Sequence, residues 1–157
     1  VLFRSFSIVT FAGHISHMEA KPVIASAENL EAAEAYLGTF TPATLPRGAG
    51  TNTLGALQAA FAMGPDVVVF LTDGDPRSGQ GVIVETNPEK IISQARASNR
   101  TDAALYIVAL ELSGAGALLL RTLAEDAGGR FKLVDRDELL LYKARMVSAP
   151  TEPTLPN

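Results

Sequence analysis

Two segments of the sequence carry side chains whose types and spacing could bind a ligand. Residues 48–57 read Gly-Ala-Gly-Thr-Asn-Thr-Leu-Gly-Ala-Leu, a glycine-rich loop with hydroxyl groups at the start of an expected helix. Residues 71–76 read Leu-Thr-Asp-Gly-Asp-Pro, which places Asp73 directly after an apolar run. In open parallel sheets, ligands bind outside the carboxyl ends of the strands. The sequence therefore predicts a polar ligand-binding rim that includes Asp73 and the hydroxyl groups around Thr51.

The elements that must position these segments alternate in a way that predicts an α/β fold. Strands are expected at residues 6–12, 22–25, 67–72, 103–110 and 130–134. Helices are expected at residues 27–37, 53–63, 88–98 and 115–127, with only a helical turn at 139–142. The continuous apolar run at 67–72 is typical of a central strand buried on both faces. The alternation from residue 67 onward favours a three-layer, doubly wound domain, in which helices flank a mainly parallel sheet on both faces.

The composition is that of one ordinary globular domain. The chain has 157 residues, of which 47% are hydrophobic and 19% are charged. Its net charge is −4, and its 13 basic residues are scattered with no two adjacent, which argues against nucleic-acid binding. There is no cysteine, which excludes disulfides, thiolate metal sites and cysteine nucleophiles. No apolar run reaches the length of a membrane-spanning helix, and the composition does not indicate a cellular compartment.

The two ends of the chain are expected to lie outside the folded domain. Residues 1–5, Val-Leu-Phe-Arg-Ser, look like the translation of a common sequencing-adapter end, so we expect an artefactual leader there. Residues 148–157 contain three prolines and are expected to be a linker or tail. The predicted domain therefore covers residues 6–147.

Taken together, the two polar segments resemble the metal-ion-dependent adhesion site of the von Willebrand factor type A (VWA) family. In that family the site combines an Asp-x-Ser-x-Ser at the end of the first strand, a Thr in a glycine-rich loop, and an Asp in an apolar-Thr-Asp-Gly sequence. Thr51 in Gly-Ala-Gly-Thr-Asn-Thr and Asp73 in Phe-Leu-Thr-Asp-Gly match the second and third pieces. The resemblance covers residues 6–134 in the right order, with 6–11 matching the second strand and 131–134 the last. It is closest to bacterial members of the family.

The sequence departs from the family at the first piece of the site. No Asp-x-Ser-x-Ser occurs anywhere in it. The family places that motif about one strand and one helix before the segment matching residues 6–11. We therefore expect a domain that is incomplete at its N-terminus and lacks the central first strand of the family's 3-2-1-4-5-6 order. This chain alone is then expected to be poorly stable, prone to associate through strand edges and weak in Mg²⁺ affinity.

The resemblance implies a protein-binding module and not an enzyme. Mg²⁺, or Mn²⁺ or Ca²⁺ in its place, would take a direct ligand from Thr51, and a direct or water-mediated ligand from Asp73. Mg²⁺ is usually coordinated by about six oxygen ligands at about 2.0–2.1 Å. Neutral hydroxyl ligands leave the bound cation net positive, and the family implies that an Asp or Glu of a protein or peptide partner supplies one more oxygen. Asp75 is expected only to shape the rim.

Two other functional interpretations stay open. The segment from Asp73 to Asp75 resembles the nucleophile motif of haloacid-dehalogenase-type phosphatases, in which a carboxylate attacks phosphorus beside Mg²⁺. Against this, Arg77 stands where that motif has Thr or Val, and the glycine-rich loop is left unexplained. The other interpretation is a VWA domain whose metal site does not function.

Each candidate residue also has an ordinary structural interpretation. Thr51 or Thr53 could simply be a helix N-cap, because Thr is favoured there. The residues from Asp73 to Pro76 could be an ordinary turn. His14 and His17 are spaced for zinc, but the chain has no third His and no Cys, so we expect them in a surface loop.

Overall fold

A computed structural model of the chain describes residues 4–41, 43–44 and 48–148, and for residues 143–148 it describes the backbone alone. The predicted leader at residues 1–5 and the predicted tail at residues 148–157 fall mostly outside these ranges. Within them, Ser5 begins the first strand and Ser148 ends the last helix. None of the described helices is long and apolar enough to cross a membrane.

A three-stranded parallel sheet forms the centre of the fold. Its strands are β5 (Val67–Thr72), β6 (Ala104–Leu110) and β7 (Phe131–Val134), hydrogen-bonded in the order β5-β6-β7. The register pairs Val69 with Tyr106 and Ile107 with Phe131. The chain is therefore a mixed α/β protein with a parallel sheet flanked by helices, as the sequence predicts, and this arrangement is compatible with a Rossmann-like fold.

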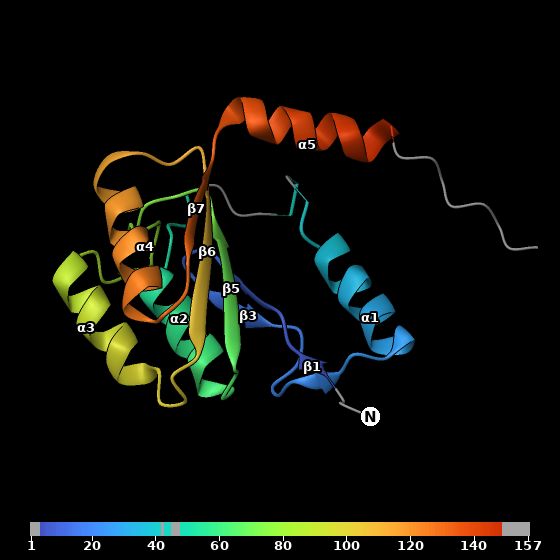
Figure 1. Cartoon of the computed structure of the whole chain (residues 1–157), viewed down its shortest axis with the longest axis horizontal. Helices are drawn as coiled ribbons and strands as arrows, with labels where there is room; N and C mark the ends of the chain where they lie inside the picture. The colour runs from blue at the N-terminus through green and yellow to red at the C-terminus, as the bar shows by residue number, and fades with distance from the viewer. Residues whose placement is uncertain (1–3, 42, 45–47, 149–157) are drawn as a thin grey trace, which may run out of the picture.

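Three helices cover one face of this sheet (Figure 1). They are α2 (Thr53–Ala62), α3 (Pro88–Ser98) and α4 (Gly114–Asp126), each within two residues of its predicted bounds. Asn87 caps α3 by accepting a hydrogen bond from the backbone N–H of Lys90, and Pro88 follows at the first helical position. The apolar sides of the helices and alternate strand residues make one core. Its largest fully buried apolar members are Leu57, Ile91, Leu105, Ile107 and Leu120.

The N-terminal part of the chain forms two small antiparallel pairs and one helix. The strands are β1 (Ser5–Phe6) with β4 (Val23–Ile24), and β2 (Val9–Phe11) with β3 (Ile15–His17); the helix is α1 (Ala27–Gly38). The single strand expected at residues 6–12 is therefore wrong, because the chain leaves the first pair at Phe6 and enters the second at Val9. The ring of Phe11 stacks on that of Phe70 with centroids 4.9 Å apart, which attaches the β2–β3 hairpin to β5.

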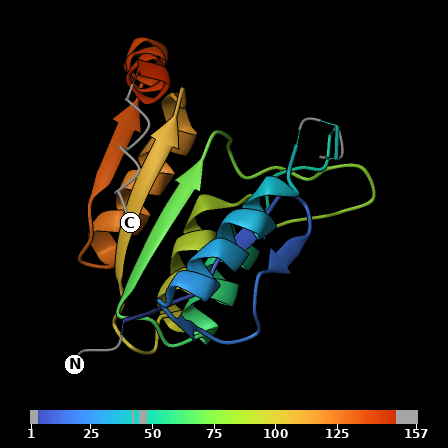
Figure 2. The same cartoon turned by 90° about the vertical axis from the view of Figure 1, so that its right-hand side faces the viewer.

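β5 lies at the edge of its sheet and not at the centre, as Figure 2 shows. Its residues Val67, Val69 and Leu71 are 51%, 72% and 57% exposed, while the alternating residues are buried against the helices. The prediction of a central strand buried on both faces is therefore wrong for the described part of the chain. The physical reason is that β5 has a hydrogen-bonded neighbour on one side only, and neither α1 nor α5 covers its second face.

α5 (Arg136–Ser148) is a complete helix where the sequence analysis predicted only a turn at residues 139–142. Asp135 precedes it and accepts a hydrogen bond from the backbone N–H of Glu138 at 2.8 Å. The helix runs away from the sheet, on the side opposite to α2, α3 and α4 (Figure 1). Its start is therefore fixed by a cap and not by packing against the core.

Candidate functional site

The glycine-rich loop and the loop after β5 are joined beside the carboxyl end of the sheet. The backbone N–H of Thr51 donates to the carbonyl of Arg77 at 2.7 Å, and the N–H of Arg77 donates back to the carbonyl of Thr51 at 3.2 Å. The side chain of Thr51 lies against Gly74: a Cβ atom on Gly74 would lie 3.1 Å from Thr51 Oγ1. The structure thus places the Thr51 hydroxyl beside the residue that directly follows Asp73.

Glycines allow the backbones of these loops to approach closely. Gly50 has a φ of +82°, and a Cβ atom there would lie 2.6 Å from the carbonyl oxygen of Arg77. Gly13, in the β2–β3 turn, and Gly79 both pack against the backbone of Ala49 with no room for a side chain. Three segments that are distant in the sequence therefore meet around Thr51.

Asn52 is the cap of α2, and neither Thr51 nor Thr53 has that role. The side-chain oxygen of Asn52 accepts from the backbone N–H of Gly55 at 2.9 Å, and its amide group donates to the carbonyl of Gly13 at 3.3 Å. The interpretation of Thr51 or Thr53 as an ordinary N-cap is therefore wrong. The preference of Asn for this position would have identified the cap from the sequence.

The loop after β5 presents Asp73 to solvent. Thr72, the last residue of the strand, folds back on the chain: its hydroxyl donates to the carbonyl of Gly74 at 3.2 Å and accepts from the N–H of Gly74 at 3.3 Å. This local turn leaves Asp73 exposed. No hydrogen bond from a described residue reaches its carboxylate, so both carboxylate oxygens are available to a ligand.

Asp75 is held differently from Asp73. Its carboxylate lies against Gly116 in the first turn of α4, where a Cβ atom would collide with it. The positive end of a helix dipole favours a carboxylate at this place. Asp75 therefore brings the loop after β5 against the start of α4. Gly116 is a residue that the sequence analysis missed, because nothing local to α4 indicates that Asp75 approaches it.

A buried hydroxyl without a partner lies one residue beyond the cap. Thr53 is fully buried, and its Oγ1 makes no hydrogen bond with any described residue. A buried hydroxyl left unsatisfied costs about 1–3 kcal/mol. The beginning of α2 therefore carries a polar group that the described part of the chain does not satisfy.

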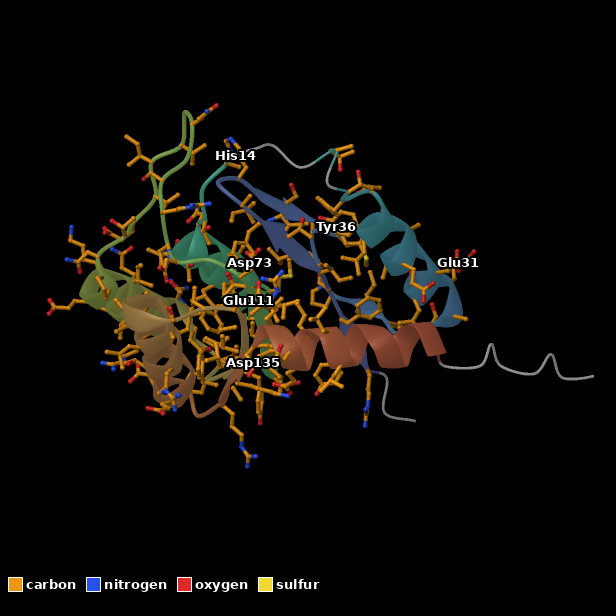
Figure 3. All side chains as sticks on the ribbon, turned by 90° about the horizontal axis from the view of Figure 1, so that it is seen from above. His14, Glu31, Tyr36, Asp73, Glu111 and Asp135 are labelled. Carbon is orange, nitrogen blue, oxygen red and sulfur yellow. The ribbon has the colours of Figure 1, made fainter. Side chains whose placement is uncertain are left out.

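Three acidic residues follow the carboxyl ends of the strands, and one of them, Glu111, has its carboxylate 3.9 Å from Nε of Arg136. Seen from above in Figure 3, Asp73, Glu111 and Asp135 lie along the end at which β5, β6 and β7 finish, whereas His14 lies apart on the hairpin. Both His14 and His17 are exposed: His14 lies in the turn of the hairpin, as expected for a surface loop, whereas the same expectation is wrong for His17, which ends strand β3. Within the described ranges, no three His, Cys, Asp or Glu side chains are grouped so that they could hold a metal ion. A cation at Asp73 would therefore also need hydroxyl, water or partner oxygens.

A cavity of about 310 Å³ lies away from these loops, between α3 and α4. Arg96 and Asp126 stand at its wall, and each is the other's ion-pair partner. Asp102 also lines this cavity, so its charged lining consists of one ion pair and one further carboxylate.

No protein-family model matches the chain, and no curated protein matches it either.

Proposed function

We propose that this chain is a divalent-cation-dependent protein-binding module of the VWA type, in which Thr51 and Asp73 supply part of a metal-ion-dependent adhesion site. One observation carries the proposal. The hydroxyl of Thr51 lies beside Gly74, next to a solvent-exposed carboxylate at the carboxyl end of a parallel strand. Ligands of open α/β sheets bind at this end of the strands.

The chemistry of the two side chains fits a hard cation. Mg²⁺ prefers oxygen ligands and keeps several waters when the protein offers few groups. Thr51 would provide a neutral oxygen and Asp73 a negative one, on loops that the Thr51–Arg77 bridge holds together. The Asp-x-Ser-x-Ser of the family's site is absent from this sequence, so we expect the chain to bind the cation weakly.

The bound cation would recruit a partner by its remaining charge. With one carboxylate ligand and otherwise neutral oxygens, a divalent cation keeps a net positive charge. It therefore attracts a further anionic oxygen, which in this proposal is an Asp or Glu carboxylate of a protein or peptide. The proposed site binds and does not turn over a substrate, so we assign no enzymatic activity to it.

The proposal also includes the three-layer architecture of a VWA-type domain around β5. In a three-layer VWA-type domain, a further strand would pair with the free edge of β5, and helices would cover the exposed side chains of Val67, Val69 and Leu71. The unpaired edge of β5, its exposed apolar face and the unsatisfied hydroxyl of Thr53 support this assignment.

The test is the effect of Asp73→Ala on binding of Mn²⁺, measured by the electron paramagnetic resonance signal of the free ion. Mn²⁺ takes the same oxygen ligands as Mg²⁺. We expect Asp73→Ala to weaken Mn²⁺ binding at least tenfold, because the site loses its only carboxylate ligand. The fold should be retained, since the side chain is exposed and accepts no hydrogen bond from a described residue.

Asp66→Ala is the matched control. Asp66 is also an exposed carboxylate next to β5, but it lies at the other end of the strand. Its removal should leave Mn²⁺ binding unchanged. Equal losses in the two variants would indicate diffuse attraction to an acidic protein and would overturn the proposed site. So would an Asp73→Ala variant that binds as the wild type does.

A further inference from the structure

The cavity between α3 and α4 lies at the end of the sheet opposite to Thr51 and Asp73. The last turns of α3 and α4 and the turn before β6 form its wall, near the bottom of Figure 1, where β6 begins. Its floor is apolar and reaches the core, because Phe61, Leu105 and Leu123 line it and none of them is more than 4% exposed. A volume of about 310 Å³ is at the lower end of the range for small-molecule sites. The cavity is therefore of a size for a small organic compound with an apolar body.

The charged groups of the cavity lining leave one carboxylate without a partner among the described residues. Arg96 and Asp126 form a two-point contact, in which Nε of Arg96 donates to one carboxylate oxygen at 2.8 Å and Nη2 donates to the other. The hydrogen bond from Arg96 lowers the pKa of Asp126, so both groups keep their charges at neutral pH. No described residue donates a hydrogen bond to the carboxylate of Asp102. With one cation and two anions, the lining carries a net negative charge and suits a cationic ligand.

The backbone around Asp102 holds its side chain in place. Asp102 has a φ of +52°, a left-handed conformation that Asp adopts more readily than most residues. On one side, the side chain of Asn99 accepts from the N–H of Ala103 at 2.8 Å and donates to the carbonyl of Ala103 at 2.9 Å. On the other side, the hydroxyl of Thr101 donates to the carbonyl of Pro65 at 3.0 Å. The residues that flank Asp102 are thus fixed, so its carboxylate is held at the cavity wall.

Two helix ends add negative potential at the same place. α3 ends at Ser98 with Asn99 as its C-cap, and α4 ends at Asp126 with Ala127 as its C-cap. Both cap residues line the cavity. The carboxyl end of a helix carries a partial negative charge, which favours a cation nearby. The two helix ends and the carboxylate of Asp102 therefore favour a ligand of the same charge.

We propose that this cavity binds a small organic monocation, a primary ammonium group on a short hydrocarbon body, with the ammonium at Asp102 and the hydrocarbon on the apolar floor. An ammonium group has three N–H donors, which match the free oxygens of the carboxylate. The hydrocarbon body displaces water from the apolar floor, which is favourable. A free amine and the side chain of a lysine share this chemistry. The cavity uses neither Thr51 nor Asp73, so this proposal is independent of the proposed metal site.

The first test compares three ligands that have the same carbon chain and different charges. Pentylammonium, 1-pentanol and pentanoate are each titrated into the chain and followed in ¹H–¹⁵N spectra. We expect pentylammonium to shift the amide signals of Asn99, Asp102 and Gly128, with a millimolar Kd because the ligand is so small. 1-Pentanol should bind about tenfold more weakly because it lacks the charge, and pentanoate should not bind. Equal binding of pentylammonium and 1-pentanol would overturn the proposal, and so would shifts spread over the other acidic residues.

The second test removes the charge of Asp102 and keeps its shape. Asp102→Asn is suited to this, because Asn also adopts a positive φ readily. The variant should weaken pentylammonium binding about tenfold and leave 1-pentanol binding unchanged. Asp137→Asn is the control, because Asp137 is an exposed carboxylate on α5 that does not line the cavity, and this variant should bind as the wild type does. Wild-type binding of pentylammonium by Asp102→Asn would overturn the proposal.

Filling the cavity distinguishes binding inside it from attraction to the protein surface. Ala127→Leu enlarges a side chain of the cavity wall, so it should abolish binding of both pentylammonium and 1-pentanol. Ala115→Leu, at the exposed start of α4, is the control and should change neither. Circular dichroism checks that both variants keep their helices. Undiminished binding of pentylammonium by a folded Ala127→Leu variant would contradict the proposal.

A lysine derivative with a blocked backbone, Nα-acetyl-lysine N-methylamide, identifies the source of the cation. It presents the ammonium of a lysine side chain on a neutral backbone. Binding as tight as that of pentylammonium, and weakened by Asp102→Asn, would assign the cavity to a lysine of a peptide or protein. Binding of pentylammonium alone would assign it to a free amine. The proposal is overturned if neither compound shifts the amides of the lining residues.

Discussion

Replacing Leu57 with alanine is expected to leave this chain without a cooperative unfolding transition. Leu57 lies on α2 and is fully buried in the core formed with β5 and α3. Truncating a buried leucine costs about 2–5 kcal/mol, because it removes apolar contacts and leaves a cavity. A whole domain is stabilised by about 5–15 kcal/mol, and the exposed apolar face of β5 places this chain at the low end of that range.

The matched control is Leu118→Ala, measured by the same denaturant titration. Leu118 lies on α4 but is 65% exposed, so its truncation should change the free energy of unfolding by no more than about 0.5 kcal/mol. A Leu57→Ala variant that unfolds as cooperatively as Leu118→Ala would show that the described core is not the stabilising centre of the fold.

The wild-type chain itself is expected to melt below about 45 °C, the lower bound for ordinary mesophilic domains, and to respond little to Mg²⁺. The side chains of Val67, Val69 and Leu71 are mostly exposed and so contribute little hydrophobic stabilisation. Among the described strands, β5 is hydrogen-bonded to β6 alone. A cation held by two protein side chains adds little stability, because weak binding shifts unfolding only slightly. Association through the edge of β5 should make the melting temperature rise with protein concentration.

Thermal melts followed by circular dichroism at several protein concentrations, with and without Mg²⁺, measure this. A soluble monomer with one cooperative transition, clearly raised by Mg²⁺, would show that the chain is self-sufficient. It would also show that the free edge of β5 does not destabilise the fold.

The parallel sheet and its helices could be predicted because their signals are local. An unbroken apolar run such as residues 67–72 is a strand in almost any α/β context. Asn87 followed by Pro88 begins a helix by side-chain and backbone geometry alone. Elements of this kind depend on neighbouring residues, so the sequence is sufficient to place them.

The position of β5 in the sheet could not be predicted in the same way. A continuous apolar run indicates that both faces are suited to burial, but it does not say which segment covers each face. The length of α5 was missed for a different reason. Asp135 and Glu138, three residues apart, form an acidic helix-start pattern, but the apolar run from Leu139 to Tyr142 has no helical spacing that would predict a full helix.

The residues of the candidate site can be predicted from their types in the sequence, but the way the loops pack around them depends on tertiary contacts. The motifs around Thr51 and Asp73 predict both residues as ligands from the sequence alone. The bridge between Thr51 and Arg77, and the approach of Asp75 to Gly116, depend on how separate loops pack. No local pattern encodes such contacts between loops.

The central claim is that Thr51 and Asp73 hold a divalent cation, and paramagnetic broadening by Mn²⁺ tests it most directly. In a ¹H–¹⁵N spectrum of the wild-type chain, small additions of Mn²⁺ should first broaden the amide signals of Thr51, Asp73 and Gly74. The amides of Gly64 and Asp66, at the other end of β5, should stay sharp. Asp73→Ala should remove the selectivity. Uniform broadening, or broadening centred on another part of the chain, would contradict the claim.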